Sequence, residues 1–133
     1  MIVRKSFRFS SKEEEKTLTT HLHLILGLKC KGIIEIVRVL ERKSKEFIVD
    51  YEYVGENLKN SQKVQENGWM QHAKEVLKSS TEQIAQVGIK IELKIEDIGV
   101  TAEGELKIFL PLTFEIVSEG KRKMLVQEYQ SQI

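Results

Sequence analysis

Two histidines separated by one leucine, His21 and His23, have the spacing in this chain that most resembles a metal site. On a strand, residues two apart point to the same side, so the two imidazoles could share one divalent ion. A third ligand would have to come from elsewhere in the fold, and the candidates are Asp50, Glu52, Cys30 and His72. On a helix the site would not form. We favour two exposed histidines without a cofactor, because His-x-His pairs also arise by chance.

Other reactive side chains have equally ordinary interpretations. Asp50 and Glu52 would share one face of a strand, a spacing suited to paired carboxylates, but the opposite face is apolar and the pair fits a solvated strand face. Cys30 lies between Lys29 and Lys31, two cations that could lower the pKa of its thiol, yet a solvated turn explains the same three residues. Glycine-rich phosphate loops, Cys-x-x-Cys pairs, nucleophile elbows and calcium loops are absent from the sequence. We therefore lean away from an enzyme.

A loose family resemblance is confined to about the first 55 residues. Its elements are Phe9-Ser10-Ser11, His21-x-His23 and Val49-Asp50-Tyr51, which are similar to segments of the 6-pyruvoyltetrahydropterin synthase family. That family binds zinc through three histidines in a strand-rich fold, so the resemblance implies zinc at the histidine pair. Its first zinc histidine has no counterpart near Ser11, however, and Cys30 follows the pair where the family's catalytic cysteine precedes it. We do not identify the chain as a member.

The size and composition favour one folded domain over residues 1–133. The 133 residues are 41% hydrophobic and 31% charged with a single proline, which is typical of a globular protein and not of a disordered one. No apolar run reaches the roughly 20 residues that span a bilayer, and charges occupy the start of the chain where a signal peptide needs an apolar stretch. Together with one unpaired cysteine, this predicts a cytoplasmic protein without a membrane partner.

The charges are balanced overall but unevenly distributed. Twenty-one basic against 20 acidic residues leave a net charge of +1, so a nucleic-acid partner is not expected. Through Lys45 the chain has eleven Lys and Arg against five Glu, whereas the remainder has ten against fifteen acidic residues. The basic first third could meet an anionic ligand. We favour its pairing with the acidic remainder, within the fold or between subunits.

Alternating apolar residues predict several strands. The segments concerned are the first residues of the chain with Val3, Phe7 and Phe9, then 33–41 and 47–54 joined by a turn, 89–96, 106–116, and a last strand through Met124, Val126 and Tyr129. Turns are expected at Glu103-Gly104 and at 118–121. Pro111 lacks a backbone donor and should lie at a sheet edge or a bulge.

One long helix is predicted between the two groups of strands. Asn60 or Ser61 could cap it, and Gly88 is placed to end it. Its apolar positions recur at helical spacing at Trp69, Ala73, Leu77, Ile84 and Val87.

The segment 11–28 shows two competing periods. Ser11 to Glu14 forms a capping box that favours a helix, whereas Leu18, Thr20, Leu22, Leu24 and Leu26 alternate as in a strand. We predict a strand from about residue 16 to 28.

These elements predict an α+β fold in which an antiparallel sheet of about six or seven strands packs against one long amphipathic helix. Phe109, Pro111 and Val117 lie opposite the Leu106 to Ile116 stripe, so that strand is apolar on both sides and one side should meet something else. We therefore expect a non-enzymatic binding or assembly module that associates with itself or with another protein through a sheet face or edge strand. The alternatives are a metal-dependent small-molecule enzyme that uses His21 and His23, and a small phage- or defence-related protein.

Overall fold

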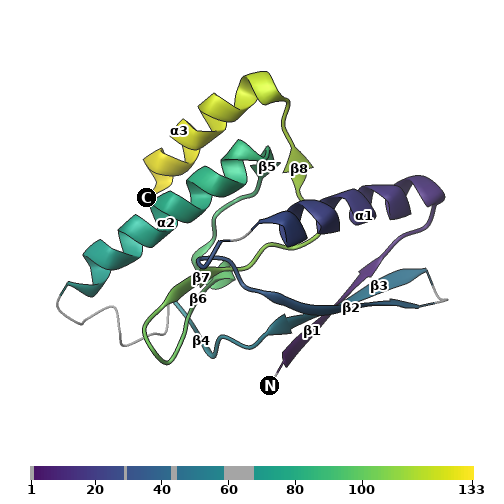
Figure 1. Cartoon of the computed structure of the whole chain (residues 1–133), viewed down its shortest axis with the longest axis horizontal. Helices are drawn as coiled ribbons and strands as arrows, with labels where there is room; N and C mark the ends of the chain where they lie inside the picture. Colours follow the sequence, from purple (N-terminus) through teal and green to yellow (C-terminus); the bar gives the residue numbers. More distant parts are fainter. Residues whose placement is uncertain (1, 29, 43–44, 59–67) are drawn as a thin grey trace.

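The structure, a computed structural model, describes residues 2–28, 30–42, 45–58 and 68–133. Helices and short antiparallel sheets alternate along these residues (Figure 1). The elements are β1 (Ile2–Arg8), α1 (Lys12–Gly27), β2 (Ile36–Arg42), β3 (Glu46–Glu52), β4 (Glu56–Asn57), α2 (Trp69–Gln86), β5 (Ile89–Lys90), η2 (Ile95–Asp97), β6 (Ile98–Val100), β7 (Leu106–Ile108), β8 (Glu115–Ile116), η3 (Glu119–Lys121) and α3 (Arg122–Gln132).

The largest sheet has the order β1-β3-β2, with both neighbours antiparallel to β3. The predicted first strand and the predicted antiparallel pairing of β2 with β3 are confirmed, and the turn predicted between these two strands falls partly outside the described residues. The register places Arg4 of β1 and Arg38 of β2 on either side of Asp50. Phe47, Val49 and Tyr51 of β3 are buried, as β-branched and aromatic residues on one face of a strand should be.

The remaining strands form two small sheets, β4-β6-β7 and β5-β8. The predicted strand 89–96 is wrong beyond Lys90, because the chain leaves β5 as a loop and enters η2. The predicted strand 106–116 is split into β7 and β8, with Pro111 in the unpaired stretch between them, where no ladder donor is needed. Its alternation of buried residues is nevertheless kept, at Leu106, Ile108, Leu110, Leu112 and Phe114. The turn at Glu103-Gly104 is also confirmed, with Gly104 at φ +84°.

Residues 16–27 are helical and Leu28 is the C-cap of this helix, so the predicted strand 16–28 is wrong. The capping box decides the outcome: the Ser11 hydroxyl accepts a hydrogen bond from the Glu14 amide at 3.1 Å, and Glu14 Oε2 accepts one from the Ser10 amide at 2.8 Å. The acidic first turn, Glu13 to Glu15, also suits the helix dipole. The residues that α1 buries are Leu18, His21, Leu22 and Ile25.

Helix α2 was predicted, but it is not the single helix of the fold. The described residues contain three α-helices, and α2 packs against α3 rather than spanning one sheet. The predicted caps Asn60 and Ser61 lie outside the described residues. The stop at Gly88 is confirmed by its φ of +83° and by its amide, which donates to the Ala85 carbonyl.

The predicted last strand is wrong because residues 122–132 form α3. Its apolar residues have helical as well as alternating spacing, and Leu125 and Tyr129, four apart, are the two that become buried. The predicted turn before it is occupied by η3.

One buried cluster joins the helices to the sheets. Helix α1 lies over one face of β1-β3-β2, and the described elements leave the opposite face open (Figure 1). The chain is therefore α+β with antiparallel sheets, as expected, but with smaller sheets than predicted. Among the described residues, no helix is long and apolar enough to cross a membrane.

Candidate functional site

Helix α1 separates the two histidines of the predicted metal site. Residues two apart on an α-helix point in nearly opposite directions, since each residue turns the chain by about 100°. The His21 ring is buried and stacks on Phe114 with 4.1 Å between ring centroids, while His23 is exposed. Nδ1 of His21 lies at hydrogen-bond distance from the Leu112 carbonyl oxygen. Because a carbonyl only accepts, that nitrogen carries the proton, and His21 acts here as a core residue.

The proposed third ligands are also engaged or distant from one another. Cys30 Sγ donates to Ser80 Oγ at 3.4 Å, His72 is exposed on α2, and Asp50 lies in the central strand of the large sheet. Within residues 2–28, 30–42, 45–58 and 68–133, no three His, Cys, Asp or Glu side chains are grouped as metal ligands. The prediction of a metal at His21 and His23 assumed a strand, and helix α1 does not provide that geometry.

The predicted interface residues lie along the segment that connects β7 to β8 and just beyond it. The Phe109 ring meets Tyr51 edge to face, with 5.0 Å between centroids, and Lys5 Nζ lies 5.5 Å from the same ring. Pro111 lines the same groove as Phe109, a space of about 750 Å³ beside Tyr129. Val117 lies apart from this groove, and its amide donates to the Gly88 carbonyl at 2.8 Å. All three residues are half-buried by the chain itself, and their interface role stays a prediction.

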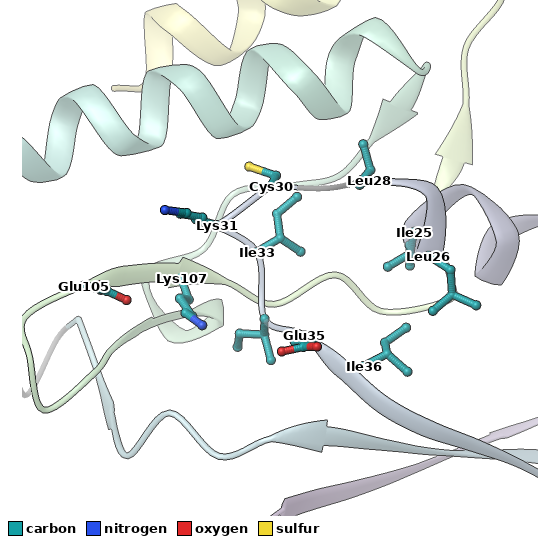
Figure 2. Close-up of a pocket in the computed structure, with 11 residues that line it drawn as sticks. Ile25, Leu26, Leu28, Cys30, Lys31, Ile33, Glu35, Ile36, Glu105 and Lys107 are labelled. Atoms are coloured by element: carbon teal, nitrogen blue, oxygen red, sulfur yellow. The ribbon is translucent and has the colours of Figure 1, made fainter.

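A second cleft, of about 580 Å³, lies between the end of α1, residues 30–36 and β7 (Figure 2). Its wall is largely aliphatic. The charged side chains around it are Lys31, Glu35, Glu105 and Lys107, and their formal charges cancel. Glu52, one of the paired carboxylates considered from the sequence, is bound by Lys107 Nζ at 2.7 Å and by the Glu35 amide at 2.9 Å. The cleft therefore offers apolar surface without a net charge that would select an ion.

The open face of the large sheet has the strongest electrostatic organisation. Asp50 is fully buried, and both its oxygens are occupied: Arg4 donates from Nε to Oδ1 at 2.7 Å and from NH2 to Oδ2 at 3.0 Å, and Arg38 donates from Nε to Oδ2 at 2.7 Å. These hydrogen bonds, first from Arg4 and then from Arg38, hold the pKa of Asp50 well below its usual range. Both arginine side chains remain about half exposed. One acid thus fixes two arginines that still face solvent.

We define the outer face of this sheet by the residues opposite the Phe47, Val49 and Tyr51 side. They are Ile2, Arg4, Ser6 and Arg8 of β1, Arg38 and Leu40 of β2, and Glu46, Ile48 and Asp50 of β3. Ser6 Oγ donates to Glu46 Oε2 at 2.6 Å, and Arg8 lies 3.7 Å from the same acid. Between these polar groups, Ile2 is 41% and Leu40 37% exposed. The outer face therefore combines ordered arginines with exposed aliphatic side chains.

Sequence reasoning placed Asp50 on a solvated strand face and missed its two partners. Arg4 and Arg38 are 46 and 12 residues away along the chain. They meet Asp50 only through the register of three strands, and the alternation within each strand does not fix that register. The signal available was the basic first third of the chain.

Comparison with known proteins adds no family to this geometry. No protein-family model matches the chain, and no curated protein matches its sequence. A function is therefore proposed from the geometry of the outer face.

Proposed function

We propose that this chain is a non-enzymatic assembly module that binds a second copy of itself through the outer face of the β1-β3-β2 sheet. The observation that carries the proposal is the open face itself, which exposes Ile2 and Leu40 where the described elements provide no covering layer. Antiparallel sheets often keep one solvated face, but that face is normally polar.

The small apolar area exposed on the outer face favours weak, reversible association. Ile2 and Leu40 are already more than half covered, so full burial of each would contribute roughly 1 kcal/mol. A two-fold symmetric dimer would bury both residues from each copy. Arg4 and Arg38 are already fixed by Asp50, so ordering them at an interface would lose less side-chain entropy than ordering free arginines.

The charges of the outer face predict how this association responds to salt. Arg4 and Arg38 share one acid and Arg8 lies beside another, which leaves a surplus of one cation per copy among these five groups. Two such faces repel each other slightly, and salt screens that repulsion. Self-association should therefore strengthen as the salt concentration rises.

The test is a Leu40→Lys substitution read by light scattering at high micromolar protein concentration. We expect the wild type to be a dimer and the variant a monomer with an unchanged thermal melt, because Leu40 is exposed in each subunit. Met124→Lys is the matched control, since Met124 is 64% exposed on α3, away from the sheet. A wild-type protein that is monomeric at this concentration contradicts the proposal, as does dissociation by Met124→Lys but not by Leu40→Lys.

A further inference from the structure

Strand β1 is a regular, unprotected edge of the large sheet. Its seven residues pair with β3 in one continuous register, and among the described residues no other strand pairs with it. Alternate amide and carbonyl groups of an edge strand point away from the sheet and are free to pair with another chain. Six of the seven residues are exposed.

The opposite edge strand, β2, does not have a continuous register. Its register with β3 shifts between Ile36 and Arg38, which leaves Val37 outside the ladder. Such bulges are a common way of preventing a further strand from adding to an edge. Strand β1 has neither a bulge nor a proline, so its protection rests on charge alone.

The charge of β1 is of one sign and complements that of the strand it already pairs with. Strand β1 contains three cations and no acid, whereas β3 contains three acids and no cation. Two contacts show this complementarity, Arg4 with Asp50 at 2.7 Å and Arg8 with Glu46 at 3.7 Å. Lys5 points to the other face, where its Nζ lies over the Phe109 ring.

We infer that the free edge of β1 binds an extended acidic segment of a partner protein, which adds to the sheet as a fourth strand. Backbone hydrogen bonds would supply affinity, and cross-strand side-chain pairs would supply selectivity. Acids are needed opposite Arg4, Lys5 and Arg8, and apolar residues opposite Ile2, Val3 and Phe7.

A second β1 strand is disfavoured as the occupant because it would bring six cations together. A nucleic-acid strand is disfavoured because the β1 side chains on the outer face include no aromatic ring on which a base could stack.

The probe is an end-capped peptide, Glu-Val-Thr-Glu-Glu-Val-Ile, whose residues match β1 read antiparallel from Arg8 to Ile2. The control peptide carries Lys at each Glu position. In an amide NMR titration of the full chain at low salt, we expect saturable shifts centred on Ile2–Arg8, slower hydrogen exchange of the β1 amides, and no binding of the control peptide. The affinity should fall several-fold as salt rises, opposite to the response expected for self-association.

Two variants test whether the peptide binds through the charges of the β1 edge or through the overall charge of the protein. The double substitution Lys5→Glu/Arg8→Glu should weaken the binding of the acidic peptide by about ten-fold or more, and Lys123→Glu on α3 by less than about two-fold. If the double variant does not fold, the single variant Lys5→Gln replaces it, and we expect its affinity for the acidic peptide to fall several-fold.

Several outcomes would overturn the inference. They are the absence of binding to the folded wild type at millimolar peptide, equal binding of the lysine peptide, shifts centred away from β1, and tighter binding of a short single-stranded oligonucleotide than of the acidic peptide. The mass measured by light scattering is independent of all of these, so the inference and the proposed self-association can fail separately.

Discussion

Asp50 connects the three strands of the large sheet through side chains as well as through the backbone. Its carboxylate is removed from water and receives hydrogen bonds from Arg4 on one side and Arg38 on the other. A buried charge is tolerated only when its partners satisfy it, so the three residues act as one unit. This unit lies in the centre of the outer face, where it keeps two arginines ordered.

The lowered pKa of Asp50 predicts how stability depends on pH. Because the folded pKa lies below the unfolded value of about 3.9, the stabilisation is fully present above that value and is lost as pH falls below it. The thermal midpoint should therefore change little through Asp50 at neutral pH and fall below about pH 4. Asp50→Asn should lower the thermal midpoint at pH 7 and make the midpoint fall less steeply below about pH 4.

Thermal melts between pH 7 and pH 3 provide this measurement. Glu115→Gln, at an exposed position, is the control and should leave the profile unchanged. An Asp50→Asn protein with the same midpoint and the same acid decline as the wild type would show that the Arg4–Asp50–Arg38 unit does not stabilise the fold.

The environment of single residues was predictable only where it depends on neighbours in sequence. The positive φ of Gly88 and the capping role of Ser11 follow from local chemistry and were visible in the sequence. The pairing of Asp50 with two arginines and the stacking of His21 on Phe114 depend on long-range packing. Neither could be read from spacing along the chain.

Among the elements, α1 shows how one sequence can satisfy two periodicities. Leu18, Leu22 and Leu26 lie on a strand-like alternation and also four residues apart, so hydrophobic spacing alone does not decide between strand and helix. The cap does decide, because the Ser11 hydroxyl accepts from the Glu14 amide, an orphan donor that exists only in a helix. Segment 122–132 has the same ambiguity, whereas α2 has a longer and clearer helical pattern.

This explanation predicts that Ser11→Ala destabilises the protein by about 1 kcal/mol, since the Glu14 amide loses its acceptor. Thr17→Ala is the control, because that hydroxyl bonds only to the Glu13 carbonyl of its own helix, and the change should stay within about 0.5 kcal/mol. Urea denaturation followed by circular dichroism measures both. Equal stability of the Ser11→Ala variant and the wild type would mean that tertiary packing, not the cap, determines α1.

At the scale of the whole molecule, residues 109–114 lie between two layers of the chain. Phe109 faces the sheet and meets Tyr51, while Leu112 and Phe114 meet His21 of α1. The apolar character of both sides, which the sequence analysis interpreted as a sign of a partner, is thus accounted for in large part within one subunit. Among the described elements, the outer face of β1-β3-β2 is left as an open sheet surface.

Substitution of Phe109 distinguishes burial within one subunit from an interface between copies. Phe109→Lys would remove the ring that packs on Tyr51 and would place a second cation beside Lys5, so we expect a loss of roughly 1–3 kcal/mol in the free energy of unfolding. Phe109→Leu keeps an apolar side chain and should cost less. If Phe109 instead lies at an interface between copies, the Lys variant should dissociate the oligomer without lowering the thermal midpoint of the subunit. Light scattering with a parallel melt distinguishes the two results, and dissociation with an unchanged melt would move the assembly surface from the outer face to the segment that connects β7 and β8.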